Sequence, residues 1–132
     1  MVGSSIEKIQ SQIDTLEQAL KRLKEAAQLE PLEIHKDGTI QRFEFCFELS
    51  WKLMQSFVQF SGMECQSPRN CIRISAQLDF IENPEDWIKY LESRNLTVHL
   101  YDQETADMVY NKAKEFISDA QSLLETVKEQ LD

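Results

Sequence analysis

Glycine and proline are scarce in this chain, and their scarcity constrains the fold more than any other sequence feature. The 132 residues include three Gly and three Pro, so the sequence holds few signals for the tight turns that join β-strands. Long helices are favoured over sheet. Hydrophobic residues make up 42% of the chain, enough for one core without disulfides or metal ions. We therefore expect an all-α protein with a single domain over residues 1–132.

A first amphipathic helix is predicted near the N-terminus. Ser4 or Ser5 can cap it, and Pro31 ends it because proline disfavours helical geometry in the residue before it. Residues 34–36 then form a connection, and His35 is interpreted as a loop residue without metal-ligand spacing. The apolar face of this helix repeats at spacings of three and four, at Ile6, Ile9, Ile13, Leu16, Leu20 and Leu23.

The second predicted helix runs from about Ile40 to Ser61, with Asp37 or Thr39 as its cap and Gly62 as its stop signal. Its apolar residues extend well beyond one face and include Phe43, Phe45, Phe47, Leu49, Trp51, Phe57 and Phe60. A helix this apolar should be buried on several sides.

Two further helices complete the prediction. Ser67 and Pro68 indicate the cap and first residue of a third helix, which is bent or split near Asn83-Pro84. A fourth helix runs from about Asp102 to Leu131, with apolar residues at spacings of three and four. Because short loops place consecutive helices antiparallel, the four helices are expected to form an antiparallel up-and-down four-helix bundle.

The cysteines and the net charge limit the classes of function. Cys46, Cys65 and Cys71 are odd in number and lack Cys-x-x-Cys spacing, so neither a disulfide nor a zinc site is predicted, and no cofactor is expected. The sequence shows no signal peptide and no membrane span, which predicts a cytoplasmic protein. A formal net charge of −9 disfavours broad adhesion to nucleic acid, so any RNA contact must be local.

Reactive side chains gather between the third and fourth predicted helices. On an ideal helix Arg94 and Tyr101 lie almost on one line. Asn95 and His99 share the adjoining stripe, so the four side chains can line one shallow cleft. An Arg that binds phosphate and a His that transfers protons suit metal-free cleavage of RNA, which supplies its own 2′-hydroxyl nucleophile. Alternatively, Arg94 can pair with an acid such as Glu92 and His99 can cap the helix end, which is a purely structural arrangement.

Two other pairs are candidates for supporting roles. Glu44 and Glu48 lie one turn apart on the second helix, where they can bind a cation or orient a catalytic Arg. They can also face solvent or bridge to Lys52. Arg69 and Arg73 can contact phosphates near the cleft, or lie solvated at a helix start. No metal ligands are predicted.

Three stretches resemble one known protein family. They are FEFCFELSWKLMQ (Phe43 to Gln55), SPRNCIR (Ser67 to Arg73) and RNLTVHLYDQETA (Arg94 to Ala106), in that order. In these three stretches the chain is similar to the nucleotidyltransferase substrate-binding proteins of the HEPN superfamily, and the resemblance covers nearly the whole chain. The most specific element is the string Arg-Asn-x-x-x-His-x-Tyr, which ends at Tyr101.

The resemblance implies a homodimeric four-helix bundle that assembles with a minimal nucleotidyltransferase encoded beside it. In related HepT-like toxins the Arg-x4-His pair, here Arg94 and His99, belongs to a metal-independent ribonuclease site. The partner can act as antitoxin by transferring AMP to the motif tyrosine, here Tyr101. We therefore expect the partner subunit of such a nucleotidyltransferase within a toxin–antitoxin pair. A ribonuclease activity of its own and a non-catalytic role as a helical scaffold dimer are the alternatives that the sequence allows.

Overall fold

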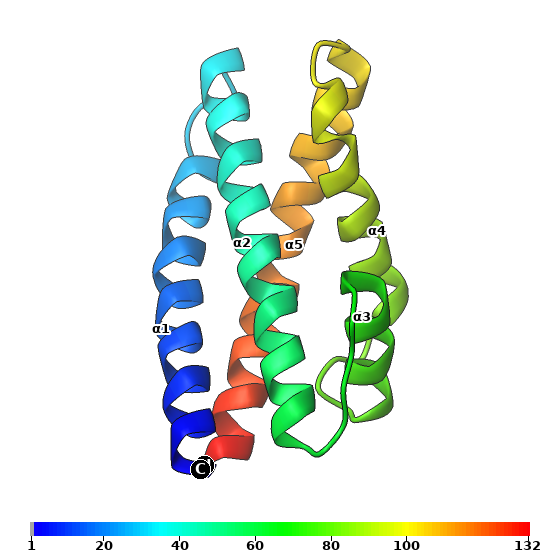
Figure 1. Cartoon of the computed structure of the whole chain (residues 1–132). Coiled ribbons are helices and arrows are strands. Elements are labelled where there is room, and N and C mark those ends of the chain that lie inside the picture. The colour runs from blue at the N-terminus through cyan, green and yellow to red at the C-terminus, as the bar shows by residue number, and fades with distance from the viewer. Residues whose placement is uncertain (1) are drawn as a thin grey trace.

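The structure is a computed structural model that describes residues 2–132, with side chains described from Ser5 onward. Over this range the chain is all-α and contains no strand. The elements are α1 (Val2–Ala27), α2 (Glu33–Phe60), α3 (Pro68–Gln77), α4 (Pro84–Asn95), the 3₁₀ helix η1 (Leu96–His99) and α5 (Gln103–Leu131). Figure 1 shows α1 and α2 antiparallel, with α3 and α4 on the side of α2 away from α1. α5 packs against α1, α2 and α4. None of the described helices is both long and apolar enough to cross a membrane.

α1 begins earlier than the sequence predicted. Its first residue is Val2, so Ser4 and Ser5 lie inside the helix and neither is its cap. The physical reason is that nothing before these serines breaks a helix, since even a glycine costs only about 1 kcal/mol there. The helix ends at Ala27, ahead of Pro31 as predicted, and its predicted apolar face is buried from Ile9 onward.

α2 also begins early, at Glu33 instead of Ile40, and residues 34–36 are helical. Leu32 is extended and provides no side-chain cap, but its carbonyl accepts the first helical hydrogen bond at 2.9 Å. The predicted caps Asp37 and Thr39 therefore lie inside the helix. A capping residue can equally sit in a helix interior, and the backbone before it decides which role it takes.

His35 is a helical residue and not the loop residue that the sequence suggested. Its Nδ1 lies 2.7 Å from the backbone oxygen of Glu30. A carbonyl only accepts, so Nδ1 carries the proton in this contact. The hydrogen bond ties the connection after α1 to the first turn of α2.

The predicted stop at Gly62 and the predicted cap at Ser67 are both confirmed. Gly62 has φ +89°, a left-handed conformation, and its amide and that of Met63 donate to carbonyls near the end of α2. Ser67 Oγ accepts a hydrogen bond from the Asn70 amide at 3.2 Å, at the start of α3.

The third predicted helix is two helices, and the chain reverses direction between them. Asp79 is left-handed (φ 63°), and the Phe80 amide donates to the Ser75 carbonyl at 2.8 Å, which closes α3. Figure 1 shows α3 parallel to α2 and α4 running back. The split near Asn83-Pro84 is confirmed. The expectation that each helix runs antiparallel to the one before it is wrong for α3, because residues 61–67 return along α2 before the helix begins.

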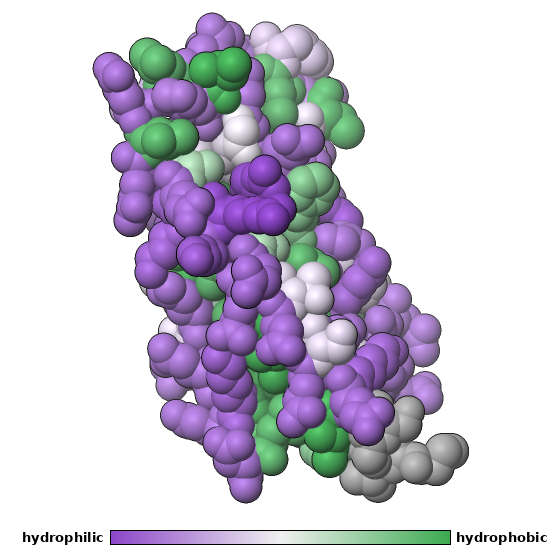
Figure 2. Space-filling model, turned by 90° about the vertical axis from the view of Figure 1, so that its left-hand side faces the viewer, coloured by the Kyte–Doolittle hydropathy of each residue, from purple (hydrophilic) through white to green (hydrophobic). Residues whose placement is uncertain are grey.

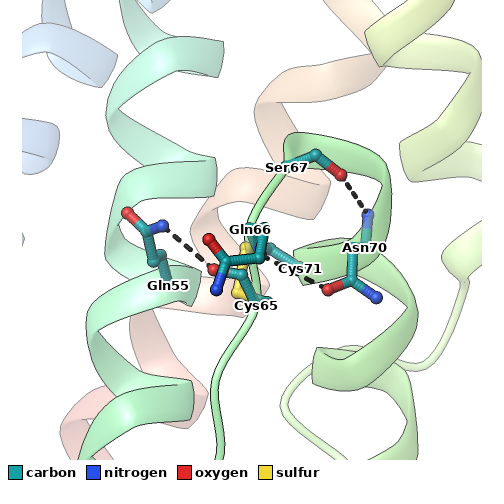
Figure 3. Close-up of a disulfide and its surroundings, with 6 residues drawn as sticks. All are labelled: Gln55, Cys65, Gln66, Ser67, Asn70 and Cys71. Carbon is teal, nitrogen blue, oxygen red and sulfur yellow. Dashed lines mark hydrogen bonds between the residues drawn. A yellow bond between two sulfur atoms is a disulfide. The ribbon is translucent and has the colours of Figure 1, made fainter.

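A disulfide joins Cys65 to Cys71, which contradicts the prediction that the chain has none. Their Cα atoms are 5.0 Å apart. Figure 3 shows the reason: the chain passes α2 on its way to Ser67, and the first turn of α3 comes back to the level of Cys65. The Gln55 side chain donates to the Cys65 carbonyl at 3.1 Å and holds this segment against α2. A spacing of six matches no disulfide motif, so only the path of the chain brings the pair together.

Aromatic side chains from three helices meet in the core. Phe43 and Phe47 of α2, Trp87 of α4 and Phe116 of α5 are fully buried. Phe116 contacts Phe43 and Trp87 edge-on, with ring centroids 5.2 and 5.5 Å apart. Such pairs add about 0.5–1.5 kcal/mol each to the effect of apolar burial. This cluster fixes α4 against α2 and α5, and so fixes where the segment after α4 begins.

α2 is buried on one side and partly open on the other, which corrects the expectation that it is covered on several sides. Phe45 is 50% exposed, Phe60 is 37% exposed and Trp51 is half-buried. The inner side holds the free thiol of Cys46. Burial raises the pKa of this thiol to about 12, although the positive charge of Arg42 lowers it.

Figure 2 shows the face of the molecule that α1 covers. Hydrophilic residues dominate this face, with apolar residues at its upper end and in a strip below.

Candidate functional site

The motif residues pass through three different backbone conformations. α4 ends at Asn95, η1 ends at His99, and Asp102 caps α5 by accepting the Thr105 amide hydrogen bond at 3.1 Å. Hydrogen bonds from the hydroxyl and amide of Thr105 hold the pKa of Asp102 below its ordinary value. A 3₁₀ helix turns about 120° per residue where an α-helix turns about 100°. The two adjoining stripes drawn on an ideal α-helix are therefore wrong for this segment.

Arg94 is held by an acid on α2. Its Nη2 lies 2.5 Å from Glu48 Oε2, and its Nη1 donates to Asn95 Oδ1 at 3.2 Å. The acid suggested by the sequence, Glu92, is not its partner. Lys52 lies 3.6 Å from Glu48, as the sequence allowed. A guanidinium has five N–H donors, so the contacts fix the direction of Arg94 and leave donors for a phosphate.

The surroundings of Glu48 keep its carboxylate ionised. Partial burial alone would raise its pKa, but the indole N–H of Trp51 and the charges of Arg94 and Lys52 outweigh burial and hold the pKa below its ordinary value. Trp51 Nε1 is buried and has no hydrogen-bond partner among the described residues. It therefore acts on the carboxylate as a nearby dipole, and Arg94 provides the direct contact.

Thr97, which the sequence reasoning did not single out, fastens η1 to the helices around it. Its Oγ1 lies 2.7 Å from the Arg94 carbonyl and 3.3 Å from Glu44 Oε2. Glu44 and Glu48 therefore hold different residues of the same segment. The available signal was a threonine three residues after Arg94, since Ser and Thr hydroxyls bond to carbonyls three or four residues earlier.

His99 and Tyr101 face each other at the open end of the segment. His99 Nδ1 and the Tyr101 hydroxyl are 3.3 Å apart, and the rings meet edge-on with centroids 5.9 Å apart. His99 is exposed and Tyr101 is 85% exposed. No hydrogen bond or ion pair of the described chain links this pair to Arg94. The four side chains form two contact pairs: Arg94 with Asn95 at the end of α4, and His99, the last residue of η1, with Tyr101.

The remaining predicted site residues are not joined to the motif. Arg69 and Arg73 lie exposed on α3, and among the described residues neither forms an ion pair or a side-chain hydrogen bond. In the part of the chain that the structure describes, no three His, Cys, Asp or Glu side chains are placed to hold a metal ion. Glu44 and Glu48 have separate partners, which gives no support to a cation site between them.

The segment combines a directed guanidinium with an accessible imidazole and phenol. Arg binds phosphate oxygens through paired N–H donors, and imidazole moves protons near neutral pH. The exposed Tyr101 hydroxyl is open to a second macromolecule. This set of groups suits chemistry on a phosphodiester.

Two sequence comparisons identify relatives of this chain. The family model described as nucleotidyltransferase substrate binding protein like matches residues 11–129. A protein of Haemophilus influenzae named probable ribonuclease HepT is 32% identical over 97 residues. That match covers 70% of this chain and 66% of the relative, just under two thirds of its length.

Solved structures share the fold. A Thermus thermophilus protein, 31% identical, superimposes with a TM-score of 0.80 over 83% of this chain and 96% of its own. A tri-AMPylated HEPN toxin of Shewanella oneidensis, in complex with an MNT antitoxin, gives a TM-score of 0.74 over 92% and 96% of the two chains. At 20% identity it shows the fold alone. Since the family model spans nearly the whole sequence, the chain belongs to the nucleotidyltransferase substrate binding protein like family.

Proposed function

We propose that this chain is the HepT-like toxin of a toxin–antitoxin pair, that its partner is a minimal nucleotidyltransferase, and that it is a metal-independent endoribonuclease. The observation that carries the proposal is the placement of Arg94 just before η1 and of the exposed His99 at its last residue, with Arg94 held by Glu48 at 2.5 Å. Two relatives support it: one is named a probable ribonuclease HepT, and the other is a HEPN toxin bound to an MNT antitoxin.

In the proposed reaction, His99 takes the proton from a ribose 2′-hydroxyl, whose oxygen attacks the adjacent phosphorus. The bond from phosphorus to the 5′ oxygen breaks, and that oxygen takes up a proton. The products are a 2′,3′-cyclic phosphate and a 5′-hydroxyl. Arg94 stabilises the negative charge of the pentavalent phosphate, and Glu48 and Asn95 orient Arg94.

Tyr101 is the proposed acceptor of AMP. Its phenolic oxygen attacks the α-phosphorus of ATP in the active site of the partner, the bond to the β-phosphate oxygen breaks, and diphosphate leaves. His99 Nδ1, 3.3 Å from the hydroxyl, is placed to take the phenolic proton. A nucleotide on this oxygen would bring bulk and negative charge next to His99. It would therefore close the ribonuclease site, which is how the partner acts as antitoxin.

The proposal includes the assembly that the resemblance implies. The chain is a single domain, and α1, α2, α4 and α5 are the four helices of an up-and-down bundle to which α3 is added. Two copies form a homodimer. The scaffold alternative requires no exposed imidazole, whereas His99 and Tyr101 are both exposed.

The ribonuclease reaction is tested with the protein expressed alone. Intact mass first establishes that Tyr101 carries no adduct, and the protein is then incubated with cellular RNA in EDTA beside a His99→Ala variant. We expect cleavage by the native protein only. No cleavage by the unmodified native protein would leave a non-catalytic binding subunit.

The partner reaction is tested with the neighbouring nucleotidyltransferase, ATP and Mg²⁺. We expect the two proteins to co-purify, the native chain to gain the mass of AMP, and the cleavage activity to fall with that gain. Tyr101→Phe should remove the acceptor and stay active. Failure to associate, together with an unmodified tyrosine, would refute the antitoxin relationship.

A further inference from the structure

We infer that a groove between α1 and α2 binds single-stranded RNA and leads the strand to Arg94. The inference rests on the ribonuclease function proposed above and adds to it a binding site outside the Arg-x4-His motif. The groove has a volume of about 580 Å³ and is lined by side chains of both helices. The sequence suggested phosphate contacts for Arg69 and Arg73, and the inference assigns such contacts to Arg22 and Arg42 of the groove.

An exposed phenyl ring is the first feature of the groove. Phe45 is 50% exposed, although Phe43 and Phe47 on the same helix are fully buried. Ala19 and Leu49 add further apolar surface to the lining. Nucleobases stack on open aromatic rings, and this contact accepts any base because every base has a π-face.

The charge in the groove is the second feature. Arg22 of α1 and Arg42 of α2 both line it, and neither forms an ion pair in the described structure. The single acidic residue of the lining is Glu48, whose charge is met by Arg94 and Lys52. On a chain of net charge −9, this local excess of cations favours a polyanionic ligand.

Continuity with the motif is the third feature. Glu48 lines the groove and also binds Arg94 at 2.5 Å. Arg42 and Glu48 are six residues apart on α2, about 9 Å along the helix axis. A strand that binds Arg42 through a phosphate and stacks a base on Phe45 therefore continues toward Arg94. A duplex keeps its bases stacked inside and cannot use Phe45 in this way, which selects single-stranded RNA.

The site is tested by binding of a short fluorescent single-stranded RNA of mixed sequence, in EDTA, to the full chain carrying His99→Ala. Arg22→Ala with Arg42→Ala should weaken binding about tenfold or more and reduce the slope of log affinity against log salt by about 1.4, the value for two phosphate contacts. Arg69→Ala with Arg73→Ala is the matched control. It removes two exposed arginines from α3 and should change affinity less than about threefold.

The aromatic contact has its own variants. Phe45→Ala should weaken binding about fivefold or more, and Phe45→Trp should restore it because the larger ring also stacks. A duplex of the same sequence should compete poorly for the native groove. Equal affinity of Phe45→Ala and the parent, or equal loss in the two arginine pairs, would overturn the inference.

Two further outcomes are separated by the same samples. If the groove variants lose RNA only because the particle mass falls to that of a monomer, the groove is an interface between copies and the RNA site is refuted. If the unsubstituted protein cleaves RNA but Arg22→Ala with Arg42→Ala leaves KM unchanged, the groove fails while the ribonuclease stands. If the unsubstituted protein neither binds nor cleaves RNA, the proposed function itself fails.

Discussion

The two ends of α4 lie in contrasting surroundings. Near its start, Trp87 is fully buried and contacts Phe116 edge-on at 5.5 Å. After its end, Val98 is 74% and Tyr101 is 85% exposed. One helix therefore serves as a packed anchor at one end and carries accessible reactive groups at the other. Packing positions the motif without burying it.

Polar contacts follow the same division. At the start of α4, Asn83 donates to Asp86 at 3.1 Å and to Asp119 at 3.0 Å. The hydroxyl of Tyr90 also donates to Asp119. Burial raises the pKa of Tyr90, and the hydrogen bond to Asp119 raises it further. At the other end, side chains attach the chain to α2 through the contacts of Arg94 and Thr97. Substitutions at the two ends should therefore separate stability from activity.

The largest expected effect is on the packed end. Phe116→Ala should lower the free energy of unfolding by about 3–5 kcal/mol, because it leaves a cavity among Phe43, Phe47 and Trp87. Urea denaturation measures this change. Phe45→Ala is the control, and should cost less than about 1 kcal/mol because half of that ring is already exposed. Similar losses of unfolding free energy for Phe116→Ala and Phe45→Ala would show that the packed core and the exposed surface do not differ as proposed.

The open end should respond in activity and not in stability. His99→Ala should slow RNA cleavage about 100-fold to 10,000-fold, the usual contribution of a general acid or base. Its thermal unfolding midpoint should match that of the native protein because His99 is exposed. Val98→Ala, one residue earlier and also exposed, should change neither property. A large drop in the unfolding midpoint of His99→Ala would show that His99 contributes to stability, as the residues at the packed end of α4 do.

The disulfide belongs to neither end of α4, since it joins the segment before α3 to the first turn of α3, and its removal should have an intermediate effect on stability. Cys65→Ala with Cys71→Ala should lower stability by about 2 kcal/mol, the loop-closure contribution for so short a ring. RNA cleavage should remain, since no hydrogen bond or ion pair among the described residues joins the disulfide to the motif. A dithiol reductant should destabilise the native protein by a similar amount in urea denaturation. It should leave the double variant unchanged, and any further effect there would point to another reducible group.

A small effect on stability is expected at Glu48. Its pKa is lower in the folded protein than its ordinary value of 4.5, so its stabilising contribution is present above that value and is lost as pH falls toward the folded pKa. Glu48→Gln should therefore cost less than about 1 kcal/mol near pH 7. Its difference from the native protein in urea denaturation should shrink below about pH 4.

The same variant should impair cleavage, because Arg94 loses its fixed direction. Glu92→Gln is the matched control: the acid lies two residues from Arg94 on α4 but does not bind it. It should keep full activity and the native pH dependence of stability. Equal activity of the two variants would show that Arg94 needs no orientation by α2.

Spacing of apolar residues was a reliable guide to the helices but not to where they begin. The predicted ends before Pro31 and at Gly62, the cap at Ser67 and the split at Asn83-Pro84 all match the structure. Both early helix starts were missed. Proline restricts the backbone and glycine readily adopts the left-handed conformation that ends a helix, whereas Ser, Asp and Thr can cap a helix or lie within it.

The motif residues were identifiable in the sequence, but their grouping was not. An ideal helix placed Arg94, Asn95, His99 and Tyr101 on two adjoining stripes, whereas the change from α-helix to 3₁₀ helix after Asn95 leaves two contact pairs, Arg94 with Asn95 and His99 with Tyr101. The partner of Arg94 lies 46 residues away on α2. Helical geometry relates residues three or four apart and says nothing about a contact between different helices.

The sequence by itself determined that the chain is helical, where proline and glycine end its helices, and which residues carry the family motif. Only the tertiary structure decided the direction of α3, the Cys65–Cys71 disulfide, the hold of Glu48 on Arg94 and the exposure of Phe45. The first set follows from local backbone geometry and from apolar spacing within one segment. The second depends on how the segments pack together, because side chains that are distant in the sequence meet only when several helices bury their apolar faces at once.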